Sequence, residues 1–226
     1  MANELLLLGA GLAGAGVVAG GASLVQSKTT VFNTSATSFL ITLDALPAAG
    51  NSLILLIVKQ NGTSNAAAEG AGGGGAPFTL AINKNGTLAR AGILYLHNHD
   101  GLDANVLYTT NSSTKAVLIL TEWAGLLNAA PEATNSASAL ADANPAPGSV
   151  TPSSAHSLVV AVGGWTADNY LSGPTNSFVR QTPGAASNVA LEGAYQIESV
   201  AAAYLTDWAL TVGINWAASI AVFGAV

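Results

Sequence analysis

The sequence predicts an all-β fold: an antiparallel β-sandwich, expected to be a jelly roll, with an apolar N-terminal arm or helix before it. Short apolar or alternating segments recur along the chain, separated by Gly, Pro, Asn and Asp, which is the pattern of strands and turns. After residue 28 no segment shows the periodicity of an amphipathic helix. Residues 5–27 carry no charge. We therefore expect an arm or anchor over residues 1–27 and one sandwich domain over residues 28–226.

The first half of the chain holds five expected strands. Residues 39–43 alternate apolar and polar, as in a strand with one buried face, whereas residues 52–58 form a continuous apolar run, as in a strand buried on both faces. Residues 78–82 follow a Gly- and Ala-rich loop, residues 88–96 end at a polar turn, and residues 116–123 end at a tryptophan. Each segment is short enough for a strand.

The second half begins with an expected long loop or lid over residues 126–155, which is polar and rich in Ala, Pro and Ser. Five more strands are expected after it, at residues 157–162, 177–180, 189–197, 204–212 and 216–223. The two halves resemble each other weakly. Two Greek keys of a jelly roll would produce such a resemblance, and so would chance similarity between strands. The matched residues are Ser52 and Ser157, Phe78 and Phe178, Tyr95 and Tyr195, and Trp123 and Trp216.

The uncharged run at the start allows four interpretations. Gly9, Gly11 and Gly14 follow four leucines as in a dinucleotide-binding turn, but no acidic residue and no alternating helices follow at the required places. Residues 1–4 lack the basic residues of a signal peptide. A membrane anchor and an arm buried among protein subunits stay open, and we favour the arm. Its apolar contacts would come from Leu5, Leu6, Leu7, Leu8, Leu12, Val17 and Val18.

The composition indicates a chain that is surrounded by other chains. Half of the residues are hydrophobic and only 8% are charged, against about 25% in an average soluble domain. We therefore expect the partners to be other subunits of a large assembly, with the chain itself a homo-oligomer, a trimer or higher. The net charge of −6 and the six scattered basic residues argue against nucleic acid as a partner.

One cluster of residues has the chemistry of a metal site. Alternate residues of a strand face the same way, so His97 and His99 could hold one ion, with Asp100 or Asp103 completing its shell. The alternative is a solvated turn, which the Asp-Gly pair at Asp100 also favours. The chain contains no cysteine, which excludes disulfides and thiolate chemistry.

A second cluster has the chemistry of a glycan contact. Trp165, Asp168 and Tyr170 follow an expected strand, and an exposed aromatic ring can stack on a sugar while an acid binds its hydroxyls. The alternative is that Trp165 belongs to the core. The acids of the chain are dispersed, with Glu122 the best single candidate, and no Gly-X-Ser-X-Gly motif occurs. We therefore predict neither an enzyme nor a bound cofactor.

Four stretches carry a resemblance to a known class of proteins. They are GNSLILLIV from Gly50, AVLILTEWAG from Ala116, SLVVAVGGW from Ser157 and WAASIAVF from Trp216. With these stretches the chain from about residue 27 resembles jelly-roll, lectin-like virion proteins of tailed phages and gene-transfer agents. The apolar start is a departure from that pattern. The resemblance implies a structural protein at the surface or tail of a virion, and no catalytic residues.

We accordingly expect a virion structural protein, a head spike, decoration or tail component that is attached by its apolar N-terminal segment. Two alternatives remain open at this point. One is a carbohydrate-binding adhesin for host attachment, and the other is a membrane-anchored component of a lipid-containing particle.

Overall fold

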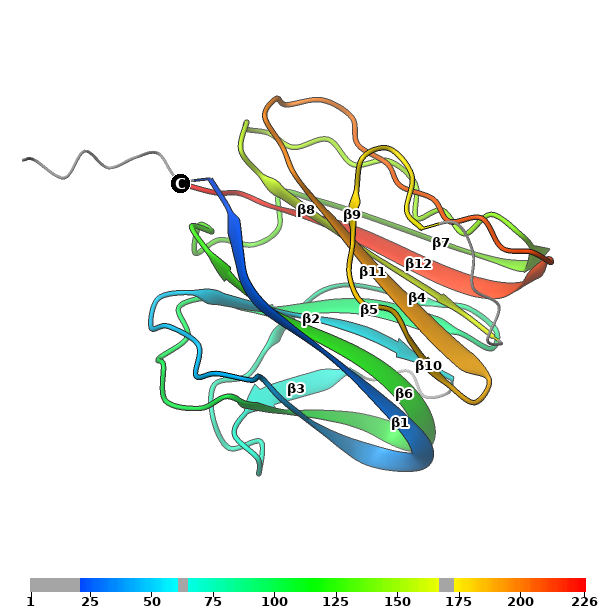
Figure 1. The fold of residues 1–226 in the computed structure, drawn as a ribbon, viewed down its shortest axis with the longest axis horizontal. Helices are drawn as coiled ribbons and strands as arrows, with labels where there is room; N and C mark the ends of the chain where they lie inside the picture. The colour runs from blue at the N-terminus through cyan, green and yellow to red at the C-terminus, as the bar shows by residue number, and fades with distance from the viewer. Residues whose placement is uncertain (1–20, 61–64, 167–172) are drawn as a thin grey trace, which may run out of the picture.

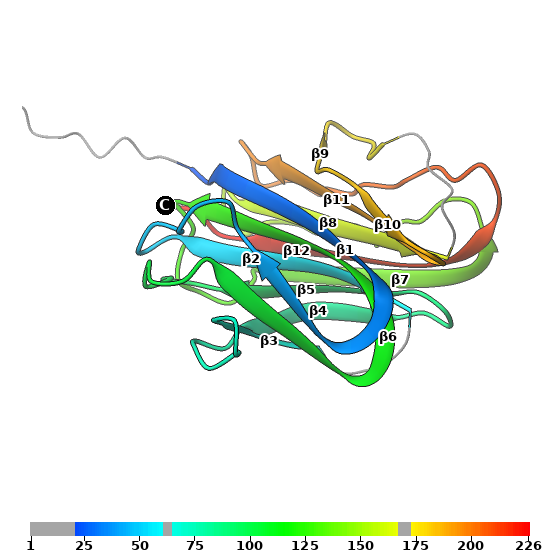
Figure 2. The ribbon, with the colours of Figure 1, turned by 60° about the horizontal axis from the view of Figure 1, so that its bottom comes forward.

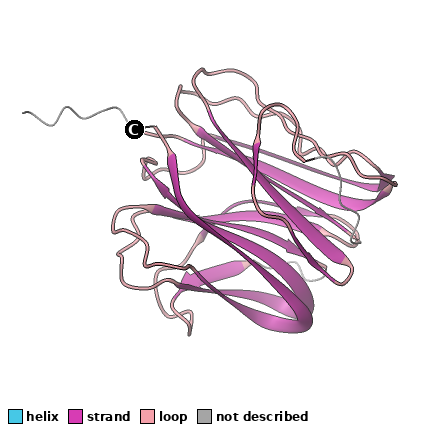
Figure 3. Cartoon of the chain, in the orientation of Figure 1, coloured by secondary structure: helices cyan, strands magenta, loops and turns pink. Residues whose placement is uncertain are grey.

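The computed structural model describes residues 21–60, 65–166 and 173–226, and the regular elements in these ranges are all strands (Figures 1 and 3). The strands form two six-stranded sheets in which every pair is antiparallel. The sheets stack face to face (Figure 2). The predicted antiparallel β-sandwich is therefore confirmed. Among these residues no helix has the length and apolar character needed to cross a membrane.

The first sheet comes entirely from the first half of the chain. Its main strands lie side by side in the order β1-β6-β2-β5-β4, and β3 pairs with β6. The strands are β1 (Ser23–Thr42), β2 (Ser52–Lys59), β3 (Ala66–Glu69), β4 (Thr79–Asn85), β5 (Arg90–Leu96) and β6 (Asn105–Ala124).

The second sheet comes entirely from the second half, and its strand order repeats that of the first. The order is β7-β12-β8-β11-β10, which is the first order with six added to each strand, and β9 pairs with β11. The strands are β7 (Ala133–Asp142), β8 (Leu158–Trp165), β9 (Val179–Arg180), β10 (Gly184–Ala186), β11 (Val189–Ile197) and β12 (Ile214–Phe223).

Strand register shows that the two sheets are equivalent in detail. Ile54 of β2 lies opposite Tyr95 of β5, and Val160 of β8 lies opposite Tyr195 of β11. The matched tyrosines of the sequence therefore occupy equivalent positions. The sheets also pack in reversed order, with β2 over β8, β5 over β12, β6 over β11 and β4 over β7. The five main strands of one sheet are thus related to those of the other by an approximate two-fold axis, as in a pseudo-dimer.

The sequence match of Trp123 with Trp216 does not hold in the structure. Trp123 on β6 lies opposite Ser52 of β2, and the equivalent pair in the second sheet is Phe223 of β12 opposite Leu158 of β8. Both aromatic rings belong to the core between the sheets. The true counterpart of Trp123 is therefore Phe223.

Three apolar layers are buried, because both sheets are covered on both faces. The layer between the sheets contains Ile54, Leu56 and Val58 of β2 against Val160 and Val162 of β8. The alternate residues of β2, such as Leu53 and Leu55, face the opposite way and are buried as well. This explains why the central strands are apolar at nearly every position, without alternation.

The outer face of the first sheet is covered by its own two longest strands. β1 and β6 are each 20 residues long, and their register shifts between Phe32 and Ser38. The pair curls there (Figure 2), and its far part packs Phe39, Ile41 and Tyr108 onto the outer side of β2 and β5. Register shifts of this kind bend a strand pair.

The outer face of the second sheet is covered mainly by loops. Val150, Phe178, Trp208 and Leu210 lie in the connecting segments around it and pack against the outward residues of β8, β11 and β12. The equivalent sheets are therefore covered by different structures. The two-fold relation holds for the sheets and is broken outside them.

Most of the expected strands are confirmed. Residues 52–58, 88–96, 189–197 and 216–223 correspond to β2, β5, β11 and β12, and the other expected strands in the first half also lie in strands. Residues 157–162 correspond to β8, and residues 177–180 shorten to the two-residue β9.

Two expectations about the second half are wrong. The long loop predicted over residues 126–155 contains β7, whose ten residues pair with β12 along their length. The Ala, Ser and Thr side chains of β7 are half exposed at the sheet edge. The strand therefore lacks the apolar run by which a buried strand is predicted from sequence. The strand predicted over residues 204–212 is irregular apart from single-residue bridges at Tyr204, which pairs with Val150, and at Ala209.

The boundary between arm and sandwich also lies earlier than residue 28. β1 begins at Ser23, and Ser23 to Ser27 pair with β6 between Ala124 and Thr121. These residues therefore belong to the sheet. The predicted anchor residues, Leu5, Leu6, Leu7, Leu8, Leu12, Val17 and Val18, lie outside the described residues.

A substitution at Gly164 tests the packing between the sheets. A Cβ at this residue would lie 2.4 Å from Cγ1 of Val58, closer than two carbons approach. We expect Gly164→Ala to lower the free energy of unfolding by about 1–3 kcal/mol, the range for overpacked cores. Gly72→Ala is the control, because a Cβ there meets nothing within 4 Å, and we expect a change within about 0.5 kcal/mol. Urea unfolding measures both, and equal effects would contradict the packing argument.

Candidate functional site

His97 follows the end of β5 and joins the first sheet to the connection between the halves. Its Nε2 lies 2.9 Å from the carbonyl oxygen of Ala129, which can only accept, so Nε2 carries the proton. Its Nδ1 then accepts from the hydroxyl of Ser52 at 2.7 Å. The ring also packs on Tyr95 and Phe223. Burial lowers the pKa of His97, opposed by the hydrogen bond to Ala129.

The same histidine lines an open cleft of about 310 Å³. The other lining residues are Thr79, Tyr95, Leu96, Asn128, Ala129 and Ala130. None of these lining residues is a carboxylate, so the cleft lacks the acid and base pair that hydrolysis of a glycoside requires. His97 acts in this arrangement as a structural bridge between β2, β5, β12 and the connecting segment.

His99 is separated from His97 and is completely buried at its side chain. Its Nδ1 accepts from the backbone N–H of Gly101 at 2.8 Å. Its Nε2 lies 3.0 Å from the carbonyl oxygen of Asp103 and 2.7 Å from Oε1 of Glu69. An N–H at Nδ1 would oppose the N–H of Gly101, so the proton resides on Nε2.

The predicted metal site of His97, His99 and Asp100 does not assemble. β5 ends at Leu96, and Asn98 takes a left-handed φ of 54°, so the two histidines no longer alternate on one strand face. Glu69 takes the place that the prediction gave to His97, since ligand atoms of Glu69, His99 and Asp100 lie within 4.8 Å of one another. Sequence spacing could not reveal Glu69, which lies 30 residues away.

The hydrogen bonds of His99 argue against its role as a metal ligand. One ring nitrogen accepts from Gly101 and the other donates, so neither keeps a free lone pair in this conformation. Glu69 is buried beside it, and burial raises the pKa of Glu69 while His99 opposes the rise. The cluster therefore braces the loop after β3 against the loop after β5.

The predicted glycan contact is not supported at Trp165. Its side chain is 1% exposed and packs on the outer face of the second sheet. Gly163 makes this possible, because a Cβ there would lie 3.2 Å from the ring of Trp165 and 3.0 Å from the ring of Trp208. A buried ring cannot stack on a sugar. Asp168 and Tyr170 lie outside the described residues.

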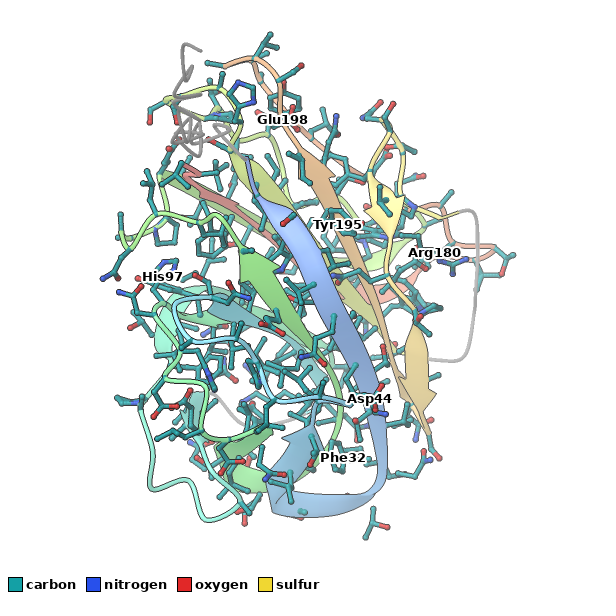
Figure 4. The ribbon with its side chains drawn as sticks, turned by 60° about the vertical axis from the view of Figure 1, so that its left-hand side comes forward. Phe32, Asp44, His97, Arg180, Tyr195 and Glu198 are labelled. Atoms are coloured by element: carbon teal, nitrogen blue, oxygen red, sulfur yellow. The ribbon has the colours of Figure 1, made fainter. Side chains whose placement is uncertain are left out.

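A half-buried ion pair that sequence reasoning missed lies on the same face. Nη2 of Arg180 donates to Oε2 of Glu192 at 2.7 Å, and the Glu192 side chain is buried. Burial raises the pKa of Glu192, and Arg180 opposes the rise. In the sequence, the one indication of this pair is Glu192 itself, a single acidic residue within the apolar run of β11. In Figure 4, Arg180 and His97 lie on different sides of the molecule, so the two polar sites are separate.

Glu122, the best single acid in the sequence, is a structural brace. Its Oε1 accepts from the backbone N–H of Ala48 at 2.7 Å and from the side-chain amide of Asn51 at 2.6 Å. Its Oε2 accepts from the amide of Gln26 at 2.6 Å. Both carboxylate oxygens are therefore occupied, and they hold the loop between β1 and β2 onto β6.

Removal of the Glu122 carboxylate tests this role. Glu122→Ala leaves three partly buried amide donors without their acceptor, so we expect a loss of about 1–3 kcal/mol in the free energy of unfolding. Asp44→Ala is the control, since Asp44 forms an exposed ion pair with Lys28, and we expect a loss of about 0–1 kcal/mol. Chemical denaturation of both variants measures the difference. Equal losses would show that Glu122 is no more important than a surface acid.

The lowered pKa of His97 leads us to expect that the stability of the fold depends on pH. Its pKa is lower in the folded chain than the ordinary value of 6.5, so below pH 6.5 the unfolded chain takes up a proton that the folded chain resists. The contribution of His97 to stability is therefore complete above about pH 7.5 and falls as the pH drops through 6.5. Unfolding at pH 8 and pH 5.5 should show a larger loss for the unchanged chain than for His97→Gln. An identical loss would contradict this prediction.

No known family model, curated protein or solved structure matches this chain significantly.

Proposed function

We propose that this chain is a structural subunit of a large protein assembly, of the virion type that the sequence resemblance implied, and that its N-terminal segment attaches it. One observation carries the proposal. The uncharged run that begins at Leu5 leads directly into β1, whose 20 residues pair with β6. A partner that holds the run is thereby connected to the core of the sandwich through a continuous strand.

The use of the polar residues supports a structural role. Glu122 and His97 form hydrogen bonds that connect loops to strands, His99 contacts Glu69 at the end of β3, and Glu192 is paired with Arg180. These groups are committed to the fold. A chain with only 8% charged residues that also uses several of them internally presents a weakly charged surface, which suits contact with other subunits.

The finer parts of the proposal rest on the resemblance alone. These are the placement as a head spike, decoration or tail component, and the jelly-roll topology. Each sheet is drawn from one half of the chain, and this duplicated arrangement is the feature that any virion relative should share.

The test is removal of residues 1–20, which leaves β1 complete. We expect the full chain to associate and the shortened chain to be a folded monomer, because the segment supplies apolar contacts that the sandwich does not replace. Light scattering after gel filtration gives the mass, and far-ultraviolet circular dichroism checks the β fold. The matched control replaces Leu5, Leu6, Leu7 and Leu8 by Ser in the full chain, which should also reduce association.

Equal masses for the full and shortened chains would overturn attachment by this segment. Flotation of the full chain with phosphatidylcholine vesicles, lost on removal of residues 1–20 and without association in solution, would instead support the membrane-anchored alternative.

A further inference from the structure

Three parts of the chain meet at one end of the sandwich, which we call the exit end because residues 1–20 leave from it. Ser23, where β1 begins, lies opposite Ala124, where β6 ends. The N–H of Val226 donates to the carbonyl of Gly125 at 2.9 Å. The start of β1 and the C-terminus are therefore neighbours, as Figure 1 shows.

The second sheet contributes to the same end. Ile197, the last residue of β11, lies opposite Leu158, which also pairs with Phe223 of β12. The rings of Phe223 and Tyr95 are 5.4 Å apart and join this end to the first sheet. Figure 4 shows Tyr195 and Glu198 of the second sheet near the upper part of β1.

The exit end exposes aliphatic side chains. They lie on the first strand, the connection between the halves, the end of β11 and the C-terminus, and each is between 41% and 61% exposed. These residues are Val25, Leu127, Ile197, Val200 and Val226. They come from four separate parts of the chain, so local sequence does not explain their gathering.

The acidic side chains of Glu132 and Glu198 at this end are directed inward. Glu132 accepts hydrogen bonds from the backbone N–H of Ser153 and the hydroxyl of Ser154. Glu198 is buried. The aliphatic side chains therefore dominate what this end offers to a partner.

We propose that the exit end is the face on which a second copy of this chain packs. The inference rests on the proposed function of residues 1–20, which leave from this face. An apolar face packs favourably on another face that carries no unpaired charge. In a two-fold dimer, the exit end of a second copy is such a face. The 20 residues beyond the face span up to about 70 Å when extended, enough to reach across a neighbouring subunit.

Charge placed on this face tests the proposal. In the full chain, Ile197→Glu with Val200→Glu puts like charges opposite each other in two copies, and we expect association to weaken at least tenfold. The matched control is Leu88→Glu with Val212→Glu. These residues are 44% and 51% exposed and lie at the opposite end, where the β4–β5 turn contacts Trp216. Analytical ultracentrifugation measures association, and thermal unfolding should be unchanged in both variants.

The outcomes separate this inference from the proposed function. Removal of residues 1–20 could abolish association while the Ile197 and Val200 variant associates normally. That result would overturn the exit end as the dimer face and support attachment by the N-terminal segment. If neither change affects association, both are wrong. Equal weakening by the control variant would show a general charge effect and overturn the exit end as a specific face. Vesicle flotation lost only in the Ile197 and Val200 variant would assign the face to lipid instead.

Discussion

The packing of β2 against β8 is the constraint on which the rest of the structure depends. Both strands are central in their sheets and buried at every residue. Burial of one large aliphatic side chain is worth roughly 1.5–3 kcal/mol, and these strands bury such side chains in both directions. Apolar residues on both faces allow a strand to slip by one residue with little change in polarity. Glycines without room for a Cβ, such as Gly164 against Val58, oppose such a slip.

The two-fold relation between the halves follows from that central contact. Each half has an inner apolar face, and the inner face of the other half packs against it. The outer faces are covered by different structures. The curled pair of β1 and β6 covers the first sheet, and loops that include Trp208 cover the second. The sheets therefore stay equivalent while their coverings differ.

Polar side chains are used chiefly to hold loops onto this frame. Glu122 binds the loop between β1 and β2. His99 forms hydrogen bonds within its own loop and contacts Glu69 at the end of β3. His97 connects the halves through Ala129. With these groups engaged internally, what distinguishes the surface is its shortage of charge and the apolar exit end.

The sequence by itself determined the β class, the turns and most central strands, because apolar runs such as residues 52–58 and 189–197 are local signals of buried strands. It also contained the Tyr95 and Tyr195 match that the duplicated sheets explain. That residues 133–142 form the strand β7 is visible only in the tertiary structure. These small polar residues form a strand because the edge of β12 is available for pairing. The tertiary structure also decided the candidate site: the φ of Asn98 separates the two histidines, and the missing Cβ of Gly163 lets Trp165 be buried. These outcomes depend on residues far apart in the chain, and a local pattern does not contain them.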